Sequence, residues 1–235
     1  TTLRDTQAMC VRERHLGSSA VDVVNDLVAL PADGSGDAVE LASGRDFFSA
    51  PRLSADGASL CWLSWDHPNM PWDGTVLSVA PFADGRVVGP VEEIAGGPAE
   101  SISQPRWSPA GTLVFASDRA GWWNLYDRDG TALCARDAEF SGPDWVFGQS
   151  TFGFLGDGRL VGVCSERNLD RLFVHPDGGG GLRFVDGLPF TSLASLHVAV
   201  DGSVVAIGAS PVMAPAVVRI DVEAGTFDVL RVRRE

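Results

Sequence analysis

A seven-residue phrase occurs twice in this 235-residue chain, as PRLSADG at 51–57 and as PRWSPAG at 105–111. Each copy precedes a short apolar run that is typical of a β-strand, at 60–64 and at 113–117. The turn glycines Gly57 and Gly111 stand 54 residues apart. A repeat of this length indicates an array of similar supersecondary units, and it constrains the architecture more than any single motif does.

The same pattern continues in weaker form further along the chain. Asp157-Gly158 leads into the apolar run 160–164, and Asp201-Gly202 leads into the run 204–208. Asp followed by Gly favours a tight hairpin turn, because Asp can bond the backbone ahead of it and Gly readily takes a positive φ. Each phrase is therefore interpreted as the turn that joins the innermost strand of a unit to its second strand.

Short β-rich runs separated by Gly, Pro, Asp and Asn dominate the sequence, and helical periodicity is nearly absent. These features predict an all-β fold, a β-propeller of four-stranded antiparallel blades that forms part of a larger ring. The chain is interpreted as one partial propeller domain over 1–235. Five blade units are predicted, at about 6–42, 47–95, 103–136, 150–186 and 194–232, with the first lacking its innermost strand. A partial ring exposes blade edges, which favours either a homodimer through those edges or closure of the arc on itself.

An acidic residue followed by an arginine recurs after the second strand of several units. The pairs stand at 13–14, 118–119 and 166–167. Because a carboxylate and a guanidinium form a strong charge-assisted hydrogen bond, we expect these pairs to bond across their hairpins. Their predicted role is structural.

Composition excludes several classes of function. A net charge of −13 argues against a nucleic-acid partner, and all 18 basic residues are arginine, so lysine chemistry is excluded. The apolar runs are too short to cross a bilayer, and no membrane partner is predicted. The four cysteines, Cys10, Cys61, Cys134 and Cys164, lack the spacing of zinc ligands. We therefore expect reduced, mostly buried thiols in a cytoplasmic protein that holds no metal and no cofactor.

No catalytic nucleophile is predicted within these residues. The nearest match to G-x-S-x-G is GQSTF at 148–152, which lacks the second glycine. The four histidines, at 15, 67, 175 and 197, have no nucleophile beside them. We therefore expect the chain alone to be inactive as an enzyme.

The segment 65–75, WDHPNMPWDGT, places a long aromatic loop where the other units have a short turn. Together with SQPRWSP at 103–109, SDRAGWWNLY at 117–126 and PDWVFG at 143–148, it resembles the propeller of the prolyl oligopeptidase family. The likeness is greatest to the bacterial dipeptidyl-aminopeptidase or acylaminoacyl-peptidase branch, and it is dense over residues 8–158. The resemblance implies a serine peptidase whose α/β-hydrolase domain carries the catalytic triad, and a propeller that admits only short peptides.

The resemblance also implies two partners, a hydrolase domain that these residues do not contain and short peptide substrates. Because strands alternate in direction, the loops between second and third strands share one propeller face with the links between blades. We expect this face to dock the hydrolase domain or to form a rim for substrate, with Glu100 or Glu139 holding a peptide's amino terminus. Its candidate residues are Trp65, Asp66, His67, Asn69, Trp72, Asp73, Glu100, Trp122, Glu139 and Trp145. Packing between blades is the alternative role of the aromatic residues.

Two other functions stay open at this point. One is a stand-alone propeller that serves as a protein-binding scaffold, as TolB-like and WD-repeat modules do. The other is a propeller enzyme with its own central site, which the lack of converging acid and base residues disfavours. Fold alone does not distinguish these functions, because one fold hosts many of them.

Overall fold

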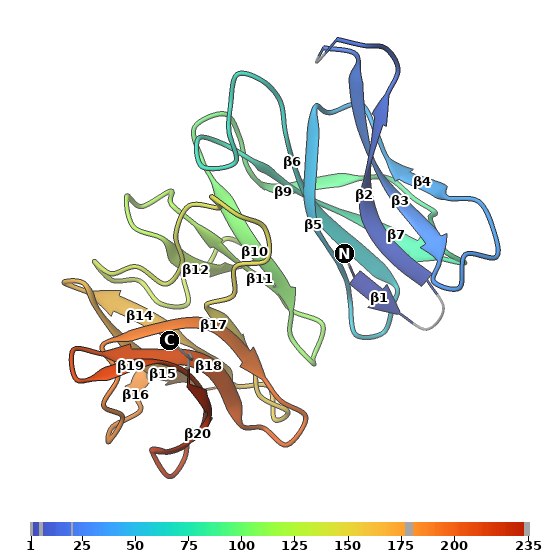
Figure 1. Cartoon of the computed structure of the whole chain (residues 1–235). Helices are drawn as coiled ribbons and strands as arrows, with labels where there is room; N and C mark the ends of the chain where they lie inside the picture. Colours follow the sequence, from blue (N-terminus) through green and yellow to red (C-terminus); the bar gives the residue numbers. More distant parts are fainter. Residues whose placement is uncertain (1, 5–6, 20, 177–180, 233–235) are drawn as a thin grey trace. The chain divides into compact units, whose positions relative to one another are not determined.

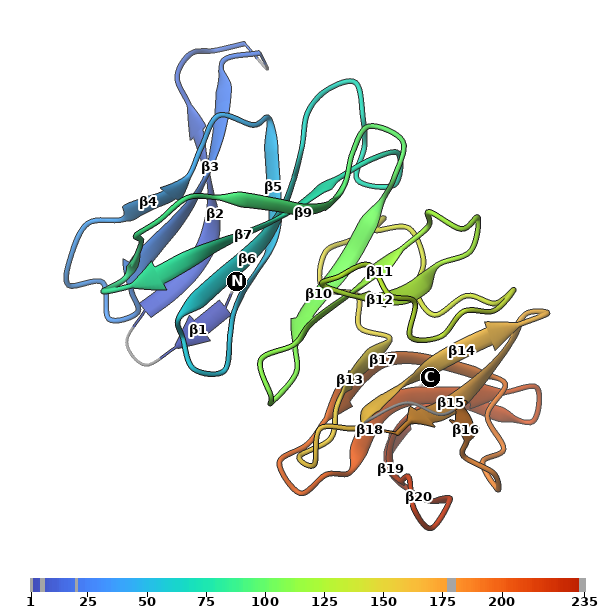
Figure 2. The same ribbon diagram turned by 180° about the vertical axis from the view of Figure 1, so that it is seen from behind.

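The computed structural model describes residues 2–4, 7–19, 21–176 and 181–232, and no helix occurs among them. The fold is all-β, a β-propeller built from antiparallel sheets whose strands follow one another in chain order. The ribbons in Figure 1 and, from behind, in Figure 2 show these consecutive hairpins. The chain divides into two compact units, Thr1–Trp107 with Pro143–Phe147, and Ser108–Gly142 with Gly148–Glu235.

The first unit contains two complete sheets and one further strand. The first sheet has the order β1-β2-β3-β4, with strands β1 (Thr2–Arg4), β2 (Gln7–His15), β3 (Val23–Pro31) and β4 (Val39–Ala42). The second contains β5 (Phe47–Leu53), β6 (Ser59–Trp65), β7 (Val76–Ala83) and β8 (Arg86–Val87), and β9 (Glu92–Gly96) also pairs with β7. Strand β10 (Ile102–Trp107) completes the unit.

The second unit contains the hairpin of β11 (Leu113–Ser117) and β12 (Asn124–Asp127) and two four-stranded sheets. One sheet contains β13 (Phe152–Phe154), β14 (Leu160–Glu166), β15 (Leu169–His175) and β16 (Arg183–Phe184). The other contains β17 (Ser192–Val198), β18 (Val204–Ser210), β19 (Met213–Asp221) and β20 (Thr226–Val232).

One expectation about the strands is wrong. The first blade does not lack its innermost strand, because β1 pairs with β2, with Thr2 opposite Met9. The shortened unit is the segment 103–136. After β12 it continues only as an isolated bridge between Tyr126 and Ala132 instead of a fourth strand. The bounds of the five blades remain a prediction.

The predicted tight turns are present at all four of the turn glycines. The backbone N–H groups of Gly57, Gly111, Gly158 and Gly202 donate to the carbonyls of residues 54, 108, 155 and 199, at 2.9–3.0 Å. All four glycines have a positive φ, between 76° and 93°. This is the left-handed conformation that glycine adopts without a steric penalty.

A second repeated feature lies seven residues before three of these glycines. Ala50, Gln104 and Ser195 have φ values of 48°, 51° and 53°. At Ala50 the β5–β6 register shifts between Ser49 and Arg52, and at Ser195 the β17–β18 register shifts between Ala194 and His197. Each shift places two residues opposite one, which is a β-bulge.

Apolar side chains from neighbouring sheets of a unit meet in three buried clusters. In the first unit Met9, Leu27, Leu60 and Trp62 belong to one cluster. In the second unit one cluster includes Phe140, Phe152 and Phe173, and the other includes Val204, Val218 and Ile220. Because each cluster draws on more than one sheet, burial of these side chains stabilises blade against blade within a unit.

Two of the predicted acid–arginine pairs make different contacts: Arg14 bonds across its own hairpin, and Glu166 bonds to a residue outside its hairpin. Arg12, which stands opposite Asp26 in the β2–β3 hairpin, donates two hydrogen bonds to its carboxylate, at 2.9 and 2.6 Å, and Arg14 adds an ion pair at 3.0 Å. Glu166 instead pairs with Arg136, at 2.6 Å, outside its own hairpin. The partner of Arg14 across the hairpin is therefore Asp26 and not the adjacent Glu13.

Candidate functional site

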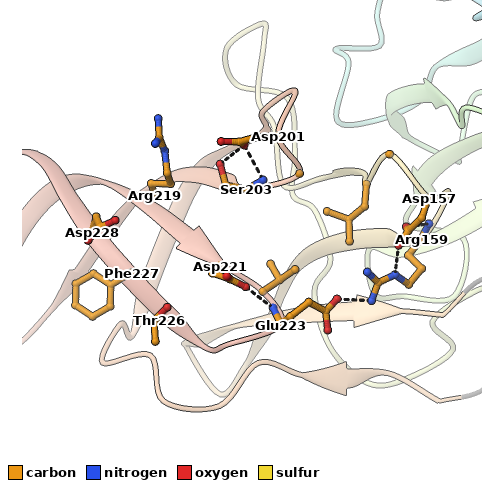
Figure 3. A pocket seen from close by; sticks show the side chains of 14 residues that line it. Asp157, Arg159, Asp201, Ser203, Arg219, Asp221, Glu223, Thr226, Phe227 and Asp228 are labelled. Atoms are coloured by element: carbon orange, nitrogen blue, oxygen red, sulfur yellow. Dashed lines mark hydrogen bonds and ion pairs between the residues drawn. The ribbon is translucent and has the colours of Figure 1, made fainter.

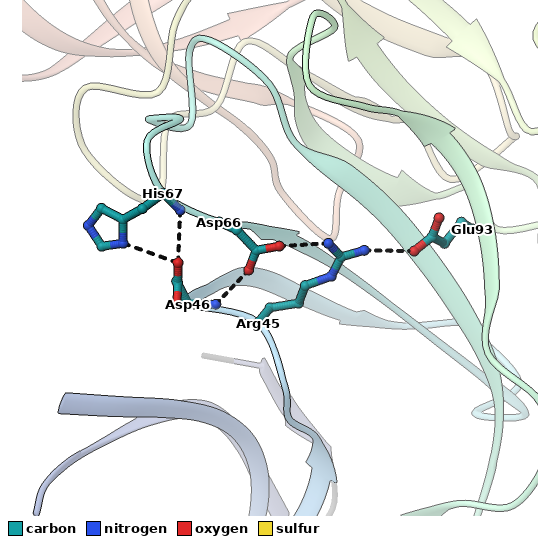
Figure 4. A network of polar contacts seen from close by, with 5 residues as sticks. All are labelled: Arg45, Asp46, Asp66, His67 and Glu93. Atoms are coloured by element: carbon teal, nitrogen blue, oxygen red, sulfur yellow. Dashed lines mark hydrogen bonds and ion pairs between the residues drawn. The ribbon is translucent and has the colours of Figure 1, made fainter. Parts of the chain in front are cut away.

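The loop 65–75 leaves the end of β6 and returns to β7, and ion pairs hold its first half in place. The Asp66 carboxylate accepts hydrogen bonds from the Arg45 guanidinium at 2.7 Å and from the Asp46 N–H at 2.8 Å. Arg45 also donates to Glu93 at 2.9 Å, and the His67 N–H donates to the Asp46 carboxylate at 2.8 Å, as Figure 4 shows. Arg45 thereby joins this loop to β9.

The electrostatics of this network favour the ionised form of Asp66. Burial alone would raise the pKa of Asp66, but the hydrogen bonds from Arg45 and from the Asp46 N–H outweigh it and lower the pKa. The Arg45 guanidinium gains a raised pKa, chiefly from the Asp66 hydrogen bond. Both groups are therefore engaged with each other and support the loop.

Hydrogen bonds between side chains and backbone groups hold the second half of the loop. The Asn69 side-chain amide donates to the Pro98 carbonyl at 3.0 Å, and the Met70 N–H donates to the Asp73 carboxylate at 2.9 Å. The Ser101 hydroxyl donates to the Pro71 carbonyl at 2.6 Å. The predicted polar residues of this loop, Asp66, His67, Asn69 and Asp73, thus fix its shape.

The aromatic residues of the loop meet others from the same unit. Trp65 stacks on Phe47 with ring centroids 5.4 Å apart, and Trp72 lies 4.2 Å from Trp145. Trp65 also contacts Phe147, at 6.5 Å. Trp145 and Phe147 belong to the segment Pro143–Phe147, which packs with the first unit although the residues on both sides belong to the second.

These rings line a pocket of about 830 Å³ that lies wholly within the first unit. Its walls come from β2, β3 and β5, from the loop 65–75 and from residues 144–147. Asp144 is half-buried at the wall, and burial raises its pKa to about 6. The pocket therefore combines a large aromatic surface with a carboxylate that is poorly solvated.

The ten predicted face residues divide between the two units. Eight of them lie in the first unit, and Trp65, Trp72 and Trp145 line its pocket. Glu100 lies at the end of the loop's return path, where its carbonyl accepts the Thr75 N–H at 3.0 Å. Whether the ten act on substrate or on a docked domain remains a prediction.

Trp122 and Glu139 lie in the second unit. The Glu139 carboxylate accepts the Trp123 N–H at 2.7 Å, and the Glu139 backbone forms an isolated bridge with Ser165. This carboxylate therefore supports the β12 hairpin. Trp122 remains 39% exposed.

Sequence reasoning did not single out Asp144 as a site residue. It stands in the PDWVFG run beside Trp145, so the run itself was the available signal. Its role depends on the return of residues 143–147 to the first unit, which no local pattern indicates. The aromatic residues were therefore easier to find than the carboxylate among them.

A second pocket, of about 640 Å³, lies in the second unit and is lined by charged residues (Figure 3). Arg159 bridges Asp157 at 2.7 Å and Glu223 at 2.5 Å. Asp201 and Asp221 accept backbone N–H groups of their own turns, at 2.9–3.0 Å. These charges are engaged in local structure, and in the described part of the chain no three His, Cys, Asp or Glu side chains are grouped as metal ligands.

The described residues also bear on two other kinds of feature, disulfide bonds and membrane-spanning helices. The described cysteines are all free, with Cys61, Cys134 and Cys164 buried and Cys10 half-buried. Over the described residues, none of the secondary structure is a helix with the length and hydropathy that a bilayer crossing requires.

Comparison with protein-family models and with curated proteins gave no match. Among solved structures, the chain is similar over 98% of its length to a puromycin hydrolase variant complexed with PGG, at 37% identity and a TM-score of 0.86. A puromycin-hydrolyzing peptidase of Mycobacterium tuberculosis matches 97% of the chain at 33% identity, with a TM-score of 0.85. The chain spans 36% of the length of each of these two proteins. A prolyl endopeptidase shares the fold alone, at 12% identity and a TM-score of 0.65, over 90% of this chain and 31% of the endopeptidase's own length.

Proposed function

Because this chain belongs to the prolyl oligopeptidase family as a β-propeller domain, we propose that it filters and orients short peptides for a serine hydrolase domain. The hydrolysis itself takes place on that domain, as part of a longer protein. The propeller's contribution is to limit which peptides reach the catalytic serine and in what direction they enter.

One observation carries this proposal. Identity of 33–37% extends over nearly the whole chain to enzymes that hydrolyse puromycin, and the chain spans only 36% of their length. The remaining length of those proteins has room for a catalytic domain. We propose accordingly that the longer protein acts on puromycin or on short peptides with a free amino terminus, as an aminopeptidase.

The test uses the longer protein that contains these residues. We expect it to release the amino-terminal residue from short chromogenic peptides and to spare folded proteins, with turnover abolished by a serine-reactive inhibitor. The 235-residue chain alone is the matched control and should show no turnover. Hydrolysis by the 235-residue chain would overturn the division of labour.

A protein-binding scaffold is the alternative. It predicts no hydrolysis by the longer protein and a stable complex with a protein partner instead. A longer protein that lacks peptidase activity but co-purifies stoichiometrically with a second polypeptide would therefore replace the peptidase proposal.

The proposal also includes a homodimer and a cytoplasmic location. Strand β20 ends its sheet in the order β17-β18-β19-β20, and nearly all of its residues are exposed, so we propose that two copies pair through this edge. Sedimentation of the purified chain tests this, since a monomer at high concentration contradicts it. A cytoplasmic location fits the free, buried thiols, and cell fractionation tests it.

A further inference from the structure

We propose that residues 143–147 form a strap that docks reversibly on the first unit, turning about Gly142 and Gly148, and that acid favours the docked position. The strap supplies one wall of the aromatic pocket, so its release opens the pocket along that side. This inference concerns a movement of the propeller chain itself, and it does not depend on the proposed function.

The strap is set apart from the chain on either side of it. Residues 143–147 belong to the first unit, whereas Ser108–Gly142 and Gly148–Glu235 belong to the second. In the described stretch between β12 and β13, residues 128–151, no strand is present. The strap is therefore a short irregular excursion that lacks the hydrogen bonds of a sheet.

A glycine stands at each end of the strap, where a hinge is needed. Apart from the adjacent residues of the chain, no heavy atom lies within 4 Å of the position that a Cβ would take at Gly142 or Gly148. Gly148 has a φ of 85°, a conformation that other residues rarely adopt. Both ends of the strap therefore have the space to change their backbone dihedral angles, as hinge residues do.

Ring contacts hold the strap on the first unit. The Trp145 ring lies 4.2 Å from the Trp72 ring, and the Phe147 ring lies 6.5 Å from the Trp65 ring. The Trp145 N–H donates to a carbonyl within the strap itself, at 2.9 Å. Among the described residues, none outside the strap forms a hydrogen bond or an ion pair with residues 144–147. The strap can therefore leave the first unit without breaking a polar contact to it.

The other aromatic wall of the pocket, the loop 65–75, is held more firmly. An ion pair and side-chain hydrogen bonds fix that loop along its length, as described above. In the strap, by contrast, Trp145, Val146 and Phe147 are 67%, 67% and 71% exposed. A segment with few buried apolar contacts opens at a lower free-energy cost than the sheets around it. The strap is therefore the wall of the pocket that moves.

Asp144 makes the docking of the strap depend on pH. Its carboxylate is half-buried in the docked strap, and burial raises its pKa from 3.8 to about 6. Release returns the carboxylate to water and restores its ordinary pKa. Because the pKa is higher in the docked state, docking is most favourable at low pH and weakens as the pH rises through about 6. A difference of about two pKa units weakens docking by up to about 100-fold.

The shift at Asp144 comes from burial, and among the described residues no neighbouring charge contributes to it. Other titratable groups are present on the elements around the pocket: Cys10 and Glu13 on β2, and Asp66, His67 and Asp73 in the loop 65–75. A comparison of wild type with Asp144→Asn cancels the effects of these groups, because both proteins carry them.

Limited proteolysis by chymotrypsin tests the strap in the 235-residue chain. The protease cuts after Trp145 and after Phe147, and mass spectrometry identifies the products. When docking is faster than cleavage, the cleavage rate follows the fraction of released strap. Near neutral pH we expect the strap of Asp144→Asn to be cut at least about tenfold more slowly than that of wild type, because a neutral amide avoids the desolvation of a charge.

The ratio of the wild-type rate to the Asp144→Asn rate gives the pH dependence, because the ratio cancels the pH profile of the protease. It should fall several-fold between neutral pH and about pH 5, as Asp144 of the wild type becomes protonated. Glu13→Gln, which removes the other carboxylate of the pocket, is the matched control and should be cut at the wild-type rate. A ratio that is constant with pH, or equal to one at neutral pH, would overturn the proposal.

Two further measurements distinguish release of the strap from unfolding of the first unit. Trp72→Ala should speed cleavage of the strap, whereas Trp72→Phe keeps a ring and should stay near the wild-type rate. Trp62 is 3% exposed, so cleavage after it requires unfolding and should not change in Asp144→Asn. Circular dichroism establishes that each variant is folded. Unchanged strap cleavage in folded Trp72→Ala, or equal slowing after Trp62 in Asp144→Asn, would contradict a strap that moves by itself.

Discussion

The buried carboxylate of Asp26 offers a direct test of how the first blade is stabilised. Its side chain is fully buried, and its partners Arg12 and Arg14 are 36% and 41% exposed. We expect Asp26→Asn to keep the size of the side chain and to remove the charge that both arginines contact. Because the two guanidiniums can regain contact with water, the cost should stay below that for a broken, fully buried pair, at about 2 kcal/mol.

The pH dependence of this effect follows from the ionisation of Asp26. The hydrogen bond from Arg12, assisted by the charges of both arginines, lowers the pKa of Asp26 in the folded chain despite its burial. A lowered folded pKa means that the stabilisation is present above the unfolded pKa and is lost as the pH falls through the folded one. The difference between wild type and Asp26→Asn should therefore be largest near neutral pH and shrink below about pH 4.

Urea unfolding followed by tryptophan fluorescence provides the assay. Five of the seven tryptophans lie in the first unit, so the signal reports mainly on the part that contains Asp26. Glu13→Gln on the same hairpin is the control, because Glu13 is 59% exposed and should contribute less than about 1 kcal/mol. A difference for Asp26→Asn that stays constant from neutral to acidic pH would refute the reasoning.

Three further predictions concern the strands and the thiols. In β14, Gly162→Ala would place a Cβ 2.8 Å from the Phe173 ring, so it should lower the free energy of unfolding by about 1–3 kcal/mol. Gly156→Ala has open space around it and should change the free energy of unfolding little. Urea unfolding of both variants checks this. Ser195 has a positive φ, so Ser195→Gly should be tolerated while Ser195→Val should lower the thermal midpoint through about 1–3 kcal/mol of backbone strain, and equal midpoints would contradict the strained bulge. Burial raises the pKa of Cys61 and Cys134 to about 12 and that of Cys164 to about 11, so a thiol reagent should modify Cys10 first and the other three only after unfolding, which mass spectrometry of the labelled peptides can follow.

The turns and strand order of this fold could be predicted because they depend on local chemistry. Ser54 illustrates this: its hydroxyl contacts the Asp56 carboxylate at 2.6 Å and accepts the Ser59 N–H at 3.0 Å, all within six consecutive residues. In the second copy of the phrase, the Ser108 hydroxyl likewise accepts the Thr112 N–H at 3.0 Å. The strand β1 could not be predicted in the same way, because no turn phrase follows Thr2–Arg4 in the sequence, and its pairing with β2 is what defines it as a strand.

The site was predictable only in part, because a sequence pattern shows local contacts and not those between distant residues. The loop 65–75 is a continuous run, so its tryptophans and polar residues were visible together. Asp144 acquires its environment from residues far away in sequence, such as Trp72 and Phe47 in the same pocket. Its desolvation is a property of that three-dimensional environment and has no counterpart in the local pattern.

The bulges at Ala50 and Ser195, and the matching φ of Gln104, place a left-handed residue seven positions before a turn glycine in three blades. Side chains alternate between the two faces of a strand, and a bulge resets that alternation. Deleting one residue within the seven should exchange inward and outward side chains up to the turn, whereas adding one beyond the glycine should only lengthen a loop. Tolerance of insertions and deletions should thus vary periodically along the chain, and natural length variation should concentrate outside these intervals.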